Sequence, residues 1–455
     1  MSTRSDINMG LLMGYMDYVF PALFPFYNPS ILEGGRSWLP ILATTNSGFG
    51  NSIISLTSYF FSIVPVVPGL DHDKCSTKTW EEVRNQIELA LNNVQHDVAI
   101  WQSRGTDTSL RDGVNLLATI VQLLHIAPEI FTSCQWQVHL KAAVALFQQM
   151  LKHHGQSSVM SGQGIEVIMK DLVGGAPFIT PVVERGAFSF FSSLLIMDDI
   201  IASTCLEKPS ELLPLLHDLQ TSSPKADPPR RLEEITGCQD WVFLVIGEVA
   251  AFDAWEKENE RTGRESSFDL IPHIDVHTIE VRWQEGMKRL YLHQQYESSS
   301  PADIKSTRPL EYILRNSDCT YGLRWCSSET RYTITSVWAQ AARVYTLSVF
   351  HGWWARESQI SNCVEETLKH LDRITSPAQL RTLVWPICVT GCLAREEQRT
   401  KLLSILSKTG ALGALRSVRE ALEIIQKVWG QQPDDGYTWD VASCLRCLGH
   451  RVLLV

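Results

Sequence analysis

The stretch from Leu11 to Leu42 constrains the fold most, because it is strongly aromatic and repeatedly broken by proline. Helical spacing runs from Leu12 to Val19 and ends at Pro21, since proline lacks an N–H and its ring clashes with the preceding turn. We expect the remainder to be an extended strap, which is apolar enough to require burial against the helices that follow. The aromatic residues are Tyr15, Tyr18, Phe20, Phe24, Phe26, Tyr27 and Trp38, and the interruptions are Asp17, Pro21, Pro25 and Pro29.

The composition favours a globular chain in a reducing compartment. The 455 residues, 44% of them hydrophobic, can bury a core without disulfides or a metal. A formal charge of −10 disfavours binding of phosphate backbones over the whole surface. The 11 cysteines form no framework, which is typical of free thiols. Charges near the N-terminus argue against a signal peptide, and the longest apolar runs that we identify, Leu11–Phe26 and Ile53–Leu70, are too interrupted to span a membrane.

The periodic segments are almost all helical. A long helix predicted to start near Thr77 has apolar residues at steps of three and four, from Val83 to Trp101. Strand-like alternation and fixed-length repeats are absent from the sequence. We therefore predict an all-α fold, a single helical domain over residues 1–455 built as an α-hairpin array, with loops or linkers at 208–231, 256–275 and 298–308. The other predicted helices are 44–63, 110–126, 135–153, a short one ending at 172, 185–205, 232–255, 276–297, 331–351, 358–374, 377–395, 411–429 and a short one within 437–455.

Two cysteine pairs are the first candidates for a metal site. Cys388 and Cys392 are one helical turn apart, and Cys444 and Cys447 form a Cys-x-x-Cys pair. Together they have the ligand types of a four-cysteine zinc site. However, the first pair lies in an apolar helix, and free cysteine is among the most buried residue types. We therefore favour core packing and predict no metal site.

Asp198-Asp199 on an apolar helix resembles the aspartate-rich motif of terpene synthases, which holds magnesium through diphosphate. A third carboxylate is expected one turn later, but Ala202 occupies that region, and no second motif follows. There is also no Gly-x-Ser-x-Gly and no phosphate-binding glycine loop after a strand. We predict no catalytic residue and no cofactor, and keep a terpene-synthase-like enzyme as an alternative.

Histidines and tryptophans have simpler interpretations. His153-His154 closes a predicted helix, where a cation suits the carbonyl dipole. His273 and His277 could share a helix face, but no third metal ligand accompanies them. Trp353-Trp354 could line a ligand cavity, although tryptophan at helical spacing more often belongs to the core.

Three ordered segments resemble the regulatory domain of fungal zinc-cluster transcription factors. They are YMDYVFPALFPFY with GGRSWL, GCQDWVFLVIGEVAAFDAWEKE, and LVWPICVTGCLAREEQR, and together they cover almost the whole chain. The matching residues are Asp17, Phe20, Pro21, Phe24, Phe26, Tyr27, Gly35, Arg36 and Trp38 in the first, Gly237, Cys238, Trp241, Leu244, Ile246, Gly247, Glu248 and Trp255 in the second, and Trp385, Pro386, Gly391, Cys392 and Ala394 in the third.

The resemblance implies an all-helical regulatory region in the nucleus that senses a signal, docks co-regulators or other transcription regulators, or forms a homodimer. A small-molecule effector is a further expected partner. In this family the DNA-binding arm has six closely spaced cysteines, whereas the first cysteine here is Cys75. We therefore expect this chain to lack that arm and to make no direct DNA contact. The alternatives are the enzyme described above and a helical scaffold without an effector.

Overall fold

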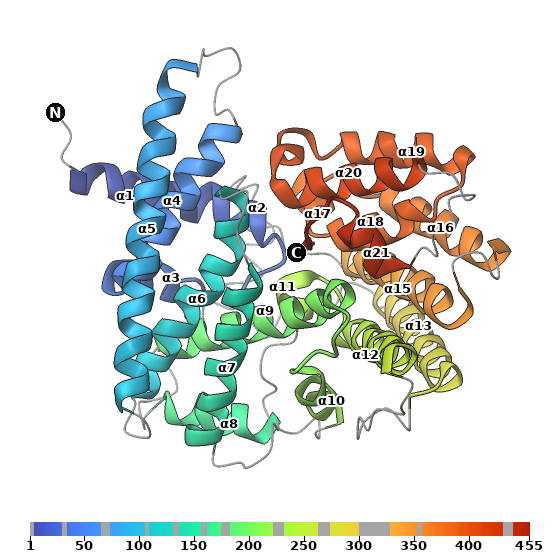
Figure 1. Ribbon diagram of the computed structural model, residues 1–455, viewed down its shortest axis with the longest axis horizontal. Helices are drawn as coiled ribbons and strands as arrows, with labels where there is room; N and C mark the ends of the chain where they lie inside the picture. The colour runs from blue at the N-terminus through green and yellow to red at the C-terminus, as the bar shows by residue number, and fades with distance from the viewer. Residues whose placement is uncertain are drawn as a thin grey trace. The chain divides into compact units, whose positions relative to one another are not determined.

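The computed structural model describes residues 4–29, 34–64, 73–104, 109–130, 136–155, 162–173, 183–221, 232–262, 274–299, 328–352, 357–430 and 440–455. Within these ranges every regular element is a helix and no strand occurs, so the all-α prediction is confirmed (Figure 1). Contacts divide the chain into two compact units, whereas the sequence analysis placed no boundary inside residues 1–455. The first unit contains Met1–Asp199, Pro214–Arg231 and Ala414–Arg416, and the second contains Ile200–Leu213, Leu232–Gly413 and Ser417–Val455.

The first boundary between the two units along the chain falls within α9, between Asp199 and Ile200. The first unit is built mainly from the helices that precede this point. Figure 1 shows α4, α5 and α6 lying side by side, and α7 packs along α6. These elements are α1 (Arg4–Gly14), a π-helix (Tyr15–Val19), α2 (Phe20–Leu23), α3 (Trp38–Thr45), α4 (Ser47–Ile63), α5 (Asp73–Arg104), α6 (Leu110–Ile130), α7 (Trp136–His154), α8 (Gly162–Asp171), α9 (Val183–Leu206) and most of α10 (Leu213–Thr221).

The second unit is organised around α15, which contacts α12, α13, α16 and α18. Its elements after α9 and α10 are α11 (Glu233–Thr236), α12 (Asp240–Thr262), α13 (Val276–Ser299), α15 (Ser328–His351), α16 (Glu357–Asp372), α17 (Pro377–Arg381), α18 (Val384–Cys392), α19 (Glu396–Ser407), a 3₁₀ turn (Gly410–Ala414), α20 (Arg416–Gly430) and α21 (Val441–Arg446).

The aromatic strap is buried, as predicted, but it is more helical than we expected. Pro21 lies in the first turn of α2, which continues directly from the π-helix Tyr15–Val19. The wider π turn interrupts the regular hydrogen-bond pattern just before the proline, and the chain stays helical through Leu23. A further helix, α3, begins at Trp38 inside the same stretch. The extended conformation that we predicted after Pro21 is therefore wrong for these two segments.

Phe190 of α9 lies at the centre of the strap's aromatic cluster. Its ring centroid is 4.7 Å from that of Tyr27 and 5.4 Å from that of Trp38. The Trp38 indole N–H donates a hydrogen bond to the Tyr27 hydroxyl at 3.1 Å, and the Arg36 guanidinium donates to the Tyr27 carbonyl. The strap is thus fixed both by ring contacts and by polar bonds among its own residues.

Tyr27→Phe should destabilise the first unit by about 1–3 kcal/mol, because the buried Trp38 N–H loses the hydroxyl oxygen that accepts its hydrogen bond. Tyr18→Phe is the matched control. Tyr18 is 60% exposed, so we expect a change within about 0.5 kcal/mol. Denaturant unfolding followed by circular dichroism measures both. Equal effects of the two substitutions would contradict the role given to the hydroxyl.

Several predicted boundaries differ for local reasons. The helix expected over 44–63 is divided, because the Asn46 side chain caps α4 by accepting from the Phe49 N–H at 3.1 Å. Pro128 lies inside α6 and does not close it. The helix predicted to start near Thr77 begins at Asp73. The Ser376 side chain accepts from the Gln379 N–H with proline at the next position, as predicted for a helix start.

Two regions expected to be loops contain helix. Within 208–231, residues Leu213–Thr221 form α10. Pro214 does not prevent this, because it stands in the first turn, where proline is tolerated. Within 256–275, α12 continues to Thr262, and the charged residues after Trp255 occupy its exposed end. Residues 263–273 and 300–308 lie outside the described residues.

Two helices, α6 and α9, are long and apolar enough to cross a membrane by length and composition alone. Neither was among the apolar runs that we singled out from the sequence. Their most apolar windows are 78% and 94% buried within the structure, so they are core helices here.

Candidate functional site

The first unit contains a groove with a volume of about 290 Å³. That volume is at the lower end of the range for small-molecule sites. Ile100, Trp101 and Leu116 give it an apolar wall, and the Trp101 indole N–H is anchored to the Gln149 side-chain oxygen at 3.1 Å. Its remaining lining residues are Thr45, Asn46, Ser47, Asp97, Arg104, Asp112 and Asn115, from the α3–α4 junction, α5 and α6.

Polar contacts hold the walls of this groove together. The Arg104 guanidinium pairs with the Asp112 carboxylate at 3.0 Å, joining α5 to α6. The Asn46 side-chain N–H₂ donates to the Asn115 carbonyl at 3.0 Å and to the Thr119 hydroxyl at 3.1 Å, joining the start of α4 to α6. The groove therefore has one apolar wall and a rim carrying charges of both signs, which suits a small amphipathic molecule.

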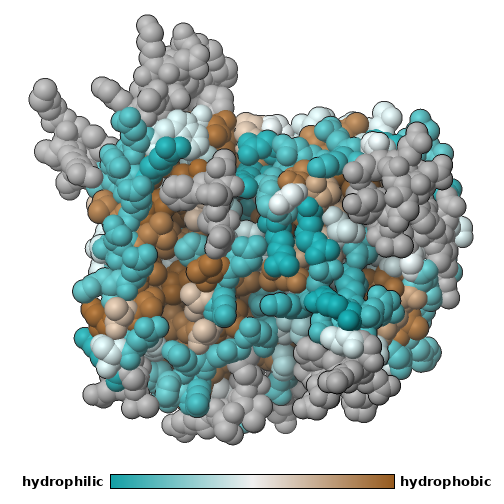
Figure 2. Space-filling view, in the orientation of Figure 1, coloured by the Kyte–Doolittle hydropathy of each residue, from teal (hydrophilic) through white to brown (hydrophobic). Residues whose placement is uncertain are grey.

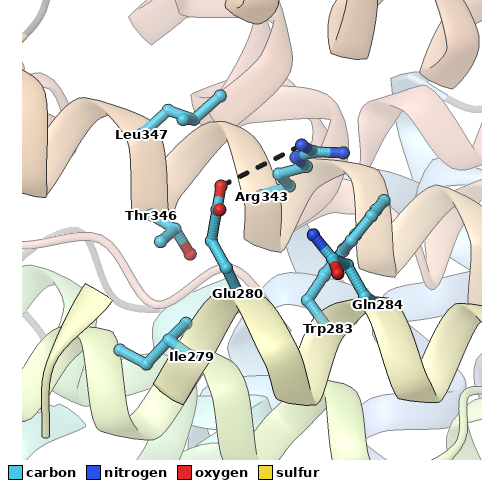
Figure 3. Close-up of a pocket in the computed structure, with 7 residues that line it drawn as sticks. All are labelled: Ile279, Glu280, Trp283, Gln284, Arg343, Thr346 and Leu347. Atoms are coloured by element: carbon cyan, nitrogen blue, oxygen red, sulfur yellow. Dashed lines mark ion pairs between the residues drawn. The ribbon is translucent and has the colours of Figure 1, made fainter. Parts of the chain in front are cut away.

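A second hollow, between α13 and α15 in the second unit, holds only about 10 Å³ (Figure 3). The Arg343 guanidinium stacks over the Trp283 ring at 4.2 Å and lies 4.0 Å from a Glu280 carboxylate oxygen. The Trp283 N–H donates to the Ala339 carbonyl at 2.7 Å. This space fits about one water molecule, so it is too small for a ligand. The contacts around it hold α13 and α15 together.

A charged cluster in the second unit is centred on Lys257 of α12. Its ammonium group lies 2.9 Å from Asp253, 3.3 Å from Glu207 and 2.5 Å from Asp440. Glu207 also pairs with Arg446 of α21. Burial raises the pKa of Asp253 to about 6. Burial lowers the pKa of Lys257, but the carboxylates of Asp253 and Asp440 outweigh it and raise that pKa to about 12. The cluster ties α12 to the end of α9 and to α21.

Asp253→Asn tests this cluster through pH. The folded-state pKa of Asp253, about 6, is above its ordinary value of 3.8, so between these pH values the folded protein keeps a proton that the unfolded chain has lost. The wild type should therefore lose about 2 kcal/mol of stability relative to Asp253→Asn as the pH rises from 4 to 7. Urea unfolding of both proteins at each pH measures the difference, in which the other titrating groups largely cancel. A constant difference would contradict the raised pKa.

Asp198 and Asp199 do not form a magnesium site. Both are buried in α9, and the Asp198 carboxylate lies 2.9 Å from the His125 ring nitrogen of α6. In the described part of the chain, no group of three or more His, Cys, Asp or Glu side chains is arranged to hold a metal ion. The aspartate pair contributes to packing within the first unit, and the terpene-synthase alternative is not supported.

The structure brings the two cysteine pairs together. Cys388, Cys392 and Cys444 are buried and Cys447 is half-buried, all with free thiols. The thiols of Cys388 and Cys444 lower the pKa of Cys392. Core packing, the favoured interpretation, describes their burial, but the sequence did not reveal that a residue of α21 would act on one of α18.

The histidine candidates that the structure describes lie on different helices. His153 and His154 end α7, and burial together with the neighbouring His153 lowers the pKa of His154. His277 lies in the first turn of α13, while His273 and Trp353-Trp354 are outside the described residues. The groove residues and Lys257 were missed because their partners are distant in sequence. The sequence feature that pointed toward the groove was the polar break over residues 103–108, directly after Trp101.

Comparisons with known proteins identify the family. A model of the fungal specific transcription factor domain matches residues 10–455. The chain is 33% identical over 463 residues to Transcription factor dibT of Pestalotiopsis microspora, covering 99% of this chain and 71% of dibT. It is 24% identical over 435 residues to Pestheic acid cluster transcriptional regulator 3 of Pestalotiopsis fici, covering 94% and 72% of the two chains.

A third relative is Trichothecene biosynthesis transcription regulator TRI10 of Trichoderma arundinaceum, 23% identical over 430 residues, with 92% of this chain and 91% of the relative covered. No solved structure matches. These relatives are named as transcription factors and regulators, not as enzymes. Because the family model spans nearly the whole chain, the resemblance seen in the three sequence segments is confirmed, and the chain belongs to the fungal specific transcription factor domain family.

Proposed function

We propose that this chain is the regulatory region of a fungal transcriptional regulator that controls a cluster of secondary-metabolism genes and acts in the nucleus. The observation that carries the proposal is the family match over residues 10–455. Two of the relatives are named for a pestheic acid cluster and for trichothecene biosynthesis, which supports a pathway-specific role.

Tethering tests this proposal directly. Fused to an unrelated DNA-binding domain, residues 1–455 should change transcription of a reporter that carries the matching operator. Deleting the gene in its host should lower or raise transcripts of a co-located gene set. A fusion without effect on the reporter, together with unchanged transcripts after deletion, would favour the non-regulatory scaffold. Residues 1–455 alone should show no shift of promoter DNA in a gel, since we propose that they do not contact DNA themselves.

The groove of the first unit is the proposed effector site. Its apolar wall and charged rim support a small amphipathic effector in preference to a metal or a nucleotide. Ile100→Trp should fill the groove and remove the response of the tethered reporter to the inducing culture condition, while leaving its basal level. Leu89→Trp is the control, because Leu89 is on the same helix, 46% exposed, and does not line the groove. An unchanged response in Ile100→Trp would argue against the groove.

A protein partner, either a co-regulator or a second copy, is also part of the proposal. Figure 2 shows apolar residues among polar ones over α5, α6 and α7 of the first unit, a surface character that often accompanies protein binding. Exposed apolar side chains of that unit include Met9, Met13 and Val138. Sedimentation of the purified chain distinguishes a homodimer from a monomer that needs another protein.

A further inference from the structure

The groove of the first unit carries an unbalanced negative charge. Its lining includes three charged residues, Asp97, Arg104 and Asp112. The Arg104 guanidinium is already paired with the Asp112 carboxylate at 3.0 Å. In the part of the chain that the structure describes, Asp97 takes part in no hydrogen bond and no ion pair. The groove therefore has one carboxylate in excess of its cations.

Helix spacing places this carboxylate beside the apolar wall. Asp97, Ile100 and Trp101 are separated by three and four residues on α5, so they share one face of the helix. Arg104 lies on the same face, two turns or about 10 Å along the axis from Asp97. A molecule that lies against Ile100 and Trp101 thus has the unpaired carboxylate at one end. At the other end it meets the Arg104–Asp112 pair, whose charges compensate each other.

The apolar wall is held in place without a ligand. The Trp101 indole N–H donates to the Gln149 side-chain oxygen at 3.1 Å. Gly113 of α6 lets the ring lie close to that helix, because an added Cβ would be 2.7 Å from a ring carbon of Trp101 and 3.2 Å from the Met150 sulfur. A wall that is already ordered adds little entropic cost when a ligand binds.

The surroundings of Asp97 favour a bound cation. Partial burial raises the pKa of its carboxyl group, His96 opposes this rise, and Asp112 adds to it. The ionised carboxylate is thus less well stabilised than in open water. An ammonium group beside it would stabilise the charge, whereas an anionic ligand would face two carboxylates.

We propose that the groove binds a small monocation, an apolar ring carrying a protonated amine, with Asp97 as its counter-ion. The ring packs against Ile100 and Trp101, and the ammonium group donates to the Asp97 carboxylate. The proposal rests on the groove being the effector site and adds the charge of the effector to that assignment. The volume of about 290 Å³ accommodates a ligand of this size.

Probes that share one ring and differ in charge make the test direct. Tryptamine is a cation, tryptophol is its neutral alcohol counterpart, and indole-3-acetate is an anion. In isothermal titration calorimetry of the full chain, tryptamine should bind about threefold more tightly than tryptophol, the size expected for a partly exposed ion pair. Indole-3-acetate should bind most weakly. Added salt should narrow the difference between tryptamine and tryptophol, since it screens exposed charges.

Substitutions of opposite sign separate charge from structure. Asp97→Asn should remove the preference for tryptamine over tryptophol. Arg104→Gln should increase that preference, because Asp112 then loses its paired cation. Glu88→Gln is the matched control, since Glu88 is an exposed carboxylate on the same helix that does not line the groove, and it should leave the preference unchanged. Circular dichroism confirms that each variant folds, and the comparison of probes on the wild type needs no variant.

Several results would overturn the inference. They are indole-3-acetate binding as tightly as tryptamine, a preference undiminished in Asp97→Asn, tryptamine binding that survives Ile100→Trp, and no binding of any probe. The tethered reporter separates this failure from failure of the effector site. If Ile100→Trp removes the response and Asp97→Asn keeps it, the groove takes an effector of another charge. If both variants keep the response, the groove is not the effector site.

Discussion

Trp385→Ala should destabilise the second unit by about 3–5 kcal/mol, the range for removing a large aromatic side chain from a packed core. Trp385 is only 1% exposed, and its ring stacks on that of Trp338 with centroids 5.6 Å apart and planes 9° from parallel. Its indole N–H also donates to the Thr204 hydroxyl at 3.1 Å. Alanine would leave a cavity at the contact of α15, α18 and the end of α9.

The measurement is denaturant unfolding by circular dichroism, with native-state hydrogen exchange of α15 and α18 to assign the loss to the second unit. Trp385→Phe is the matched variant. It keeps a ring against Trp338 and loses only the hydrogen bond and part of the volume, so about 1–2 kcal/mol is expected. Thr204 still donates to the Ile201 carbonyl, so its hydroxyl keeps a partner. Equal effects of the two substitutions would show that the ring contact is unimportant.

Lys257→Met should cost about 3–5 kcal/mol, because it leaves buried carboxylates without their shared cation. The Lys257 side chain is 20% exposed, and the neighbouring carboxylates of Asp253 and Glu207 are 10% and 17% exposed. Methionine keeps the apolar stem, so the loss reports the charge. Adding Asp253→Asn should recover part of the stability, since one uncompensated charge is removed.

The control for this prediction is Lys369→Met. Lys369 lies 2.8 Å from Glu366, but both side chains are about half exposed, so water screens the pair and its loss should change stability little. Urea unfolding at pH 7 compares the variants. If Lys257→Met were no more destabilising than Lys369→Met, water would have to solvate the Lys257 cluster as it does a surface pair.

The local pattern of the sequence was enough to predict the fold class and the burial of the aromatic strap. Steps of three and four residues identified the helices, and the aromatic residues from Tyr15 to Trp38 required an apolar surface. Gly391, one of the residues on which the resemblance rests, allows close packing, because an added Cβ there would lie 2.7 Å from Ile425 and 2.9 Å from Leu402.

The errors and omissions have physical causes that single segments do not contain. Pro21 was treated as a helix breaker and residues 208–231 as a loop, whereas the chain stays helical through Leu23 and α10 has Pro214 in its first turn. The Lys257 cluster joins residues that are far apart in the chain, and no local period encodes such contacts. Asp198 was considered as a metal ligand only because Asp198-Asp199 resembles an aspartate-rich motif. Its contact with His125 of another helix became visible only in the folded structure.

The pairing of Glu207 with Arg446 has a consequence for synthesis on the ribosome. The two residues are 239 positions apart, and both belong to the second unit. The segment that begins this unit therefore emerges long before the helix that secures it. Nearly all of the first unit is translated before residue 232, so it can fold while synthesis continues. The second unit cannot be completed until α21 has been synthesised, and during that interval its unfinished core is open to chaperones.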